Sequence, residues 1–99
     1  MTVTENRMAD STELVISGRL DTTTAPQLEA KVKEHAKGIK ILFLNLSNVE
    51  YISSAGLRVV LVAHKLMMVI GGKMIVKSPS PFCLQVLNAT GMSAALTIQ

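Results

Sequence analysis

The segment ILFLNLSNVEYISSAGLRVVL, residues 41–61, decides the fold. The run from Ile39 to Asn48 is almost continuously apolar, which is typical of a central strand covered on both faces. A second apolar run, from Leu57 to Ile70, has the length of a helix and ends at a pair of glycines. Four small residues directly precede the second run: Ser53, Ser54, Ala55 and Gly56. The segment therefore predicts a buried strand followed by a helix that opens on bare hydroxyls.

The remaining elements extend this strand–helix unit in both directions. Alternating residues predict a hairpin of strands over Thr2–Met8 and Glu13–Leu20. A helix follows before Gly38, with Thr24 as N-cap, Gln27 completing a capping box and Pro26 in the first turn. Downstream we expect a strand over Lys73–Ser78, a helix capped by Ser80 and stopped by Gly91, and a last edge strand in residues 94–99. The order ββαβαβαβ predicts an α/β fold, a mixed β-sheet with helices packed mainly on one side, in one domain over residues 1–99.

Apolar stripes indicate which helix faces are buried. In the first helix the stripe comprises Ala25, Leu28, Val32 and Ala36. In the helix after Gly56 we assign to the sheet the stripe of Leu57, Val60, Leu61, His64 and Met67. The opposite side is only partly polar, since it holds Arg58, Val62, Lys65, Leu66 and Val69. That side is a candidate protein-binding surface, and the alternatives are self-association or cover by the third helix.

Composition argues against several classes of function. Ten basic and seven acidic residues give a net charge of +3, and the basic residues are scattered among only three aromatics, so we expect no direct nucleic-acid binding. Arg58, His64 and Lys65 interrupt the longest apolar run, so we expect no membrane insertion. A lone Cys83, read as a small core residue, and the lack of a signal-peptide pattern favour the cytoplasm. Catalytic, phosphate-loop and metal-ligand motifs are absent, so we expect no enzyme, no cofactor and no metal site.

The paired serines permit two interpretations. Serine is a preferred N-cap because its hydroxyl accepts a hydrogen bond from the free amides of the first turn, and on the residues alone capping is favoured for both. The alternative is that one caps and the other is modified. A helix N-terminus attracts anions, so a phosphate there would not unfold the protein but would obstruct a partner that packs against this surface.

Three stretches resemble the anti-sigma factor antagonists, the single-domain bacterial members of the STAS family. They are ISGRLDTTTAPQLEAKV, ILFLNLSNVEYISSAGLRVVL and GGKMIVKSPSPFCLQVLNATGM, and from the first to the last they span about four-fifths of the chain in the family's order. The family motif after the strand is Asp-Ser-Ser/Thr-Gly-Leu. With Gly56 fixing the register, the family's phosphorylated serine falls on Ser54, its Asp on Ser53 and its second Ser/Thr on Ala55. Asp21 matches an acidic position beside the phosphorylation site, and it is equally well explained as a turn residue.

The resemblance implies a function by partner switching. The unmodified protein would bind an anti-sigma factor that is also a serine kinase, and phosphorylation on Ser54 would release it. A PP2C-type serine phosphatase would reset the switch. The implied partner-binding residues are Asp21, Ser53, Ser54, Ala55, Gly56, Arg58, Val62 and Lys65.

Because Ser53 replaces the family's Asp, a second role stays open. The chain could be a non-phosphorylated STAS interaction subunit of a membrane transport complex, docked through the helix that follows Ser53. A third, weaker interpretation is a small nucleotide-binding or hydrolysing protein.

Overall fold

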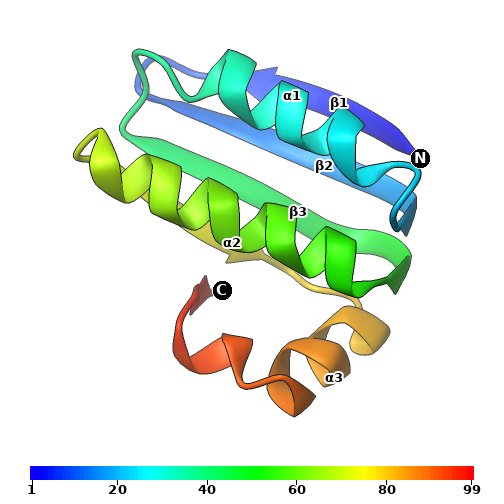
Figure 1. Cartoon of the computed structure of the whole chain (residues 1–99). Coiled ribbons are helices and arrows are strands. Elements are labelled where there is room, and N and C mark those ends of the chain that lie inside the picture. Colours follow the sequence, from blue (N-terminus) through cyan, green and yellow to red (C-terminus); the bar gives the residue numbers. More distant parts are fainter.

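The computed structural model describes residues 1–99 as a five-stranded mixed sheet with its helices in front of it (Figure 1). The strands lie in the order β1-β2-β3-β4-β5; β1 and β2 pair antiparallel and all later pairs are parallel. The strands are β1 (Thr2–Arg7), β2 (Ser11–Leu20), β3 (Ile41–Ile52), β4 (Lys73–Lys77) and β5 (Thr97–Ile98). The helices are α1 (Ala25–His35), α2 (Ser54–Val69), α3 (Pro81–Ala89) and a short 3₁₀ turn, Met92–Ala94, which the sequence did not predict. The predicted order and fold class are confirmed.

The position of the helices follows from the strand order. From β2 to β5 every strand is added on the same side of the previous one, and right-handed crossovers then place each connecting helix on the same face. Figure 1 shows α1 and α2 side by side over that face. The prediction that the central strand is covered on both faces is therefore wrong. In β3, Leu42, Leu44 and Leu46 are fully buried under the helices, whereas Ile41, Phe43 and Asn45 on the other face are half-buried.

The core is aliphatic, and most predicted stripes face it. Ala25, Leu28, Val32 and Ala36 are all buried, as are Cys83 and Leu87 of α3. In α2 the prediction is correct for Leu57, Val60 and Met67. It is wrong for Leu61 and His64, which are only half-buried, because Val59 and Ala63 take their places against the sheet and α1. None of the helices has both the length and the apolar character needed to cross a bilayer.

The end signals of α3 are confirmed. Ser80 is the N-cap, and its Oγ accepts a hydrogen bond of 3.2 Å from the Cys83 amide and donates one of 2.6 Å to the Val49 carbonyl. Pro81 stands in the first turn, and Gly91 takes the left-handed conformation just beyond the helix, where a side chain would be strained. Burial raises the pKa of the Cys83 thiol, which therefore stays protonated as a core residue.

Gly56 lets the first turn of α2 approach the sheet. A Cβ on this residue would lie 2.7 Å from the Leu20 carbonyl oxygen, 2.8 Å from Leu20 Cγ and 3.0 Å from Ile52 Cγ1. Contacts this short force the neighbouring backbone or side chains to move. Gly56 thus fixes the distance between the start of α2 and the ends of two adjacent strands.

We expect Gly56→Ala to lower the free energy of unfolding by about 1–2 kcal/mol, because overpacking costs about 1–3 kcal/mol and better helix propensity returns up to about 1 kcal/mol. Urea unfolding measures the difference. The matched control is Ala55→Gly, one position earlier, which changes helix propensity without adding volume. A Gly56→Ala protein that is more stable than the wild type would contradict the close packing.

Candidate functional site

The candidate site lies where β2 and β3 end side by side. Leu20 pairs with Ile52 in the parallel register, and the Ser53 amide donates a 3.0 Å hydrogen bond to the Leu20 carbonyl. The loops that leave these two strands therefore start from the same edge of the sheet. This pairing places Asp21, which follows Leu20, beside the two serines that open α2.

The start of α2 differs from the predicted cap. Ser53 is the N-cap residue with an extended backbone, and its carbonyl accepts from the Leu57 amide at 2.9 Å. Its hydroxyl makes no capping bond, and Ser53 Oγ is buried with no hydrogen-bond partner. Ser54 is the first helical residue and is exposed. Since neither serine caps the helix, its first amides have no side-chain acceptor and keep their attraction for an anion.

Asp21 organises the turn before α1. Its Oδ1 accepts from the amides of Thr23 and Thr24 at 3.1 and 3.2 Å. The Thr24 hydroxyl accepts from the Asp21 amide at 2.9 Å and donates to the Arg19 carbonyl at 2.8 Å. The predicted capping box of Thr24 and Gln27 is therefore wrong, because the Thr24 hydroxyl points back to the strand end. Asp21 acts as the turn residue, and its second predicted role, beside a phosphorylated serine, stays a prediction.

A cluster of aromatic and basic side chains borders the candidate site. The sequence analysis did not predict this cluster. The Arg19 guanidinium lies 4.2 Å from the centre of the Tyr51 ring, and its Nε lies 3.6 Å from Asp21 Oδ2. The Tyr51 ring is 5.7 Å from the ring of Phe82, which is 40% exposed at the start of α3. Arg19 and Tyr51 are register partners in β2 and β3. The sequence does hold a signal for this pair. If Asp21 and Ser53 are aligned at the ends of the two strands, Arg19 and Tyr51, each two residues earlier, become register partners.

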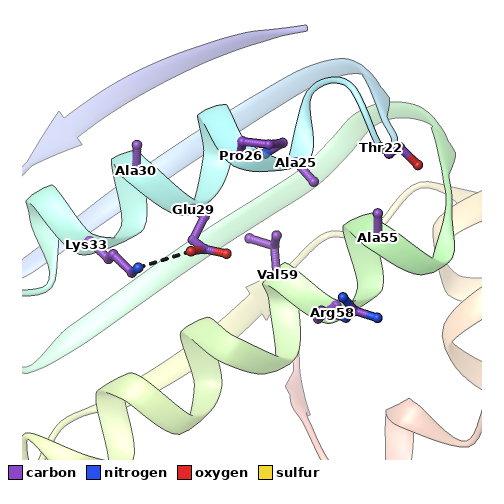
Figure 2. A pocket seen from close by; sticks show the side chains of 9 residues that line it. All are labelled: Thr22, Ala25, Pro26, Glu29, Ala30, Lys33, Ala55, Arg58 and Val59. Carbon is purple, nitrogen blue, oxygen red and sulfur yellow. Dashed lines mark hydrogen bonds and ion pairs between the residues drawn. The ribbon is translucent and has the colours of Figure 1, made fainter.

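A groove of about 450 Å³ runs between α1 and α2 and opens beside the serines. Figure 2 shows Ala55 and Val59 of α2 on the side towards Ala25 and Glu29 of α1, and Arg58 lines the groove beside them. Glu29 forms an ion pair with Lys33 at 3.0 Å along the α1 wall. A second hollow continues the groove towards Leu66 and Ile70, and the two share Ala30 and Lys33. No residue of α3 lines either hollow, so the alternative that α3 covers this side of α2 is not supported.

The structure brings together most of the predicted contact residues. Ser54 and Arg58 are exposed, and Asp21, Ser53 and Ala55 are half-buried around them. Val62 is half-buried and Lys65 is exposed, but they lie two and three turns further along α2, about 12 and 16 Å from Ser54. The prediction that Gly56 contacts a partner is wrong. Gly56 is buried against Leu20 and Ile52, so no partner can reach it.

The family model for the STAS domain matches residues 3–99. The chain belongs to the STAS family. The resemblance inferred from the three stretches of sequence is thereby confirmed, and so is the predicted arrangement of a mixed sheet with helices mainly on one face.

Three relatives of this STAS chain are informative. BtrV of Bordetella bronchiseptica, whose name describes it as an anti-sigma factor antagonist, is 34% identical over 77% of this chain, and the match spans 66% of BtrV, just under two-thirds of its length. A Thermotoga maritima protein, also described as an anti-sigma factor antagonist, is 26% identical with a TM-score of 0.88, covering 97% of this chain and 84% of that one. The Bacillus protein SpoIIAA in its phosphorylated form is 18% identical with a TM-score of 0.77, covering 99% and 91%, and shares the fold.

The hydrogen bonds to Asp21 generate a pH-dependent prediction. The bond from the Thr24 amide, more than any other contact, holds the pKa of Asp21 below its ordinary value of 3.8. A carboxyl group whose pKa is lower in the folded state stabilises the fold at pH values above its pKa in the unfolded chain. This stabilisation is lost as the pH falls through the pKa of the folded state. We therefore expect Asp21→Asn to be less stable than the wild type at pH 7, and we expect the difference to shrink as the pH falls below 3.8.

Urea unfolding of both proteins across this pH range tests the expectation. Asp10→Asn is the control, because it removes the same charge from a turn residue whose side chain makes no hydrogen bond or ion pair. A difference between Asp21→Asn and the wild type that stays constant with pH would mean that the carboxylate charge contributes nothing.

Proposed function

We propose that this STAS domain is an anti-sigma factor antagonist that works by partner switching. The unmodified protein binds an anti-sigma factor that is also a serine kinase, and the kinase transfers a phosphoryl group from ATP to Ser54. The phosphorylated protein is released, and a PP2C-type serine phosphatase removes the phosphate. The proposal places these reactions in the cytoplasm and assigns the chemistry to the partners, with the STAS domain as binder and substrate.

One observation carries the proposal: the serine at the family's phosphorylation position is exposed on the first turn of an uncapped helix. A kinase must reach the hydroxyl without unfolding its substrate, and exposed Ser54 meets that requirement, whereas the Ser53 hydroxyl oxygen is buried. Free amides at a helix N-terminus also favour the phosphate once it is attached. Modification then changes the surface while the fold is retained.

The consequence for a partner is electrostatic and steric. Arg58 lies one turn beyond Ser54 on α2 and lines the groove between α1 and α2, as does Ala55, which directly follows Ser54. A phosphate adds about two negative charges and three acceptor oxygens to this rim. A partner that packs against the start of α2 and complements Arg58 would then face a charge of the wrong sign. The half-apolar outer side of α2, including Val62 and Lys65, would extend the contact.

Substitutions at Ser54 test the switch. We expect Ser54→Ala to bind the cognate anti-sigma factor with wild-type affinity and to accept no phosphate. Ser54→Asp, which places a negative charge at the rim, should bind about a hundredfold more weakly, which corresponds to about 2.7 kcal/mol. Calorimetry with the purified anti-sigma factor, together with intact mass after incubation with ATP and Mg²⁺, measures both properties.

Ser53→Ala is the matched control, one residue away, and should still gain one phosphate. Full affinity in Ser54→Asp would refute the switch. A wild-type protein that binds its partner but never gains phosphate would favour the alternative role, a non-phosphorylated STAS subunit of a membrane transport complex. The replacement of the family's Asp by Ser53 is the observation in favour of that alternative.

The contact surface is tested separately from the modification. We expect Arg58→Glu to weaken binding of the unmodified protein by about tenfold or more, chiefly through slower association. Arg7→Glu is the matched control, since Arg7 is exposed and far from the site. Arg7 pairs with Thr12 at the opposite end of β2, and the strand from Thr12 to Leu20 is about 26 Å long. Equal loss of affinity in both variants would show a general charge effect in place of a contact at Arg58.

A further inference from the structure

A histidine and two carboxylates converge on the far side of α1, away from the serines. His35 closes α1 and is 3% exposed, and its Nε2 lies 3.1 Å from Glu5 Oε2 and 3.8 Å from Glu34 Oε2. Glu5 belongs to the edge strand β1 and pairs with Leu14, whose side chain is in the core under the helices, so Glu5 projects to the same face. The proposed partner surface uses none of these residues.

The His35 ring is unusual because neither of its nitrogens makes a hydrogen bond, although both are buried. Buried imidazole nitrogens normally have a partner, and leaving them without one is costly. The ring lies against two carboxylates, and its Nε2 faces Glu5 Oε2 at 3.1 Å as an ion-pair contact without hydrogen-bond geometry. Such a nitrogen is available as a metal ligand when the imidazole is neutral.

We propose that His35, Glu5 and Glu34 form a binding site for a zinc ion. One ligand atom from each residue lies within 4.8 Å of the others. Zinc bonds to nitrogen and oxygen are about 2.0–2.2 Å long, so neighbouring ligands of a tetrahedral site are separated by about 3.3–3.6 Å. The observed separations of 3.1 and 3.8 Å from Nε2 bracket that range. Small rotations of the two exposed glutamates suffice to close the site, and water completes the coordination.

The donor set selects the kind of ion. One imidazole and two carboxylates are typical ligands of zinc, whereas calcium and magnesium require mainly oxygen ligands in larger number. A bound ion would connect the edge strand β1 to the last turn of α1, which are separated in sequence and joined there only by side chains. The sequence analysis predicted no metal site, because Glu5 lies far along the chain from Glu34 and His35.

When no metal ion is bound, the Lys31 ammonium is the cation that contacts both carboxylates. Its Nζ lies 2.7 Å from Glu5 Oε1 and 3.6 Å from Glu34 Oε2. Both carboxylates therefore already face a cation when no metal is bound. Lys31 is 36% exposed and can swing into solvent. Zinc therefore binds in competition with Lys31, and removing the ammonium should strengthen binding.

Titration of tag-free, chelator-treated protein with zinc chloride in a calorimeter tests the proposal. We expect saturable binding of one ion per chain. Glu5→Gln and Glu34→Gln should each weaken it by about tenfold or more, and Lys31→Met should strengthen it. Glu29→Gln is the matched control, because it removes one carboxylate from the same helix outside the cluster and should bind like the wild type.

Two further measurements keep the test independent of a variant's stability. Zinc should raise the unfolding temperature of the wild type but not of Glu5→Gln, and calcium or magnesium at the same concentration should raise neither. On adding zinc, the nitrogen resonances of the His35 ring should shift while those of His64 stay in place. No saturable binding, equal binding in Glu5→Gln and Glu29→Gln, or a shift of His64 in place of His35 would overturn the proposal and leave the cluster as an ion-pair network.

Discussion

The parallel pairing of β2 with β3 is the interaction on which the candidate site depends. It aligns Leu20 with Ile52 and extends by one hydrogen bond, from the Ser53 amide to the Leu20 carbonyl. That bond fixes where α2 begins relative to the end of β2. The same Leu20 carbonyl leaves no space for a Cβ on Gly56, so the glycine sets how closely the helix approaches. Asp21, Arg19 and Tyr51 take their places as register neighbours of this pair.

The one-sided arrangement of the helices has a consequence for binding. Right-handed crossovers along a strand order without reversal place α1 and α2 next to each other on one face, where their facing sides leave a groove. The groove opens at the carboxyl ends of the strands, at the end where Ser54 and Arg58 lie. The opposite face combines half-buried apolar residues, Ile41 and Phe43, with Glu13, which is held by Asn45 at 2.9 Å and by Lys77 at 3.3 Å. Both hollows described above lie between α1 and α2, so the concave surface for a partner is on the helical side.

Patterns of hydrophobicity and local end signals predicted the element order, the stripe of α1 and the cap of α3. These features are determined by residues close in sequence, as Ser80 and Cys83 illustrate. The errors occurred where a distant group competes for the same atom. The Thr24 hydroxyl bonds to the Arg19 carbonyl in place of its own helix. Ser53 Oγ is buried without any hydrogen-bond partner, which no residue near it in sequence indicates. Likewise Arg19 with Tyr51, and Glu5 with His35, meet only through strand register and the packing of α1 over β1.

Because α2 has no side-chain cap, the replacement of the family's aspartate by Ser53 determines the charge at the start of this helix. A carboxylate at position 53 would partly neutralise the positive end of the helix dipole. Ser53 carries no charge, and its hydroxyl makes no hydrogen bond to the first-turn amides. The carboxylate of Asp21, at the end of β2, is already engaged by the amides of Thr23 and Thr24 and by Arg19. Without a phosphate, the rim is dominated by Arg58 and the N-terminal end of the helix dipole, both positive. The proposed phosphate on Ser54 would add about two negative charges within one turn of Arg58 and so reverse the sign of this surface.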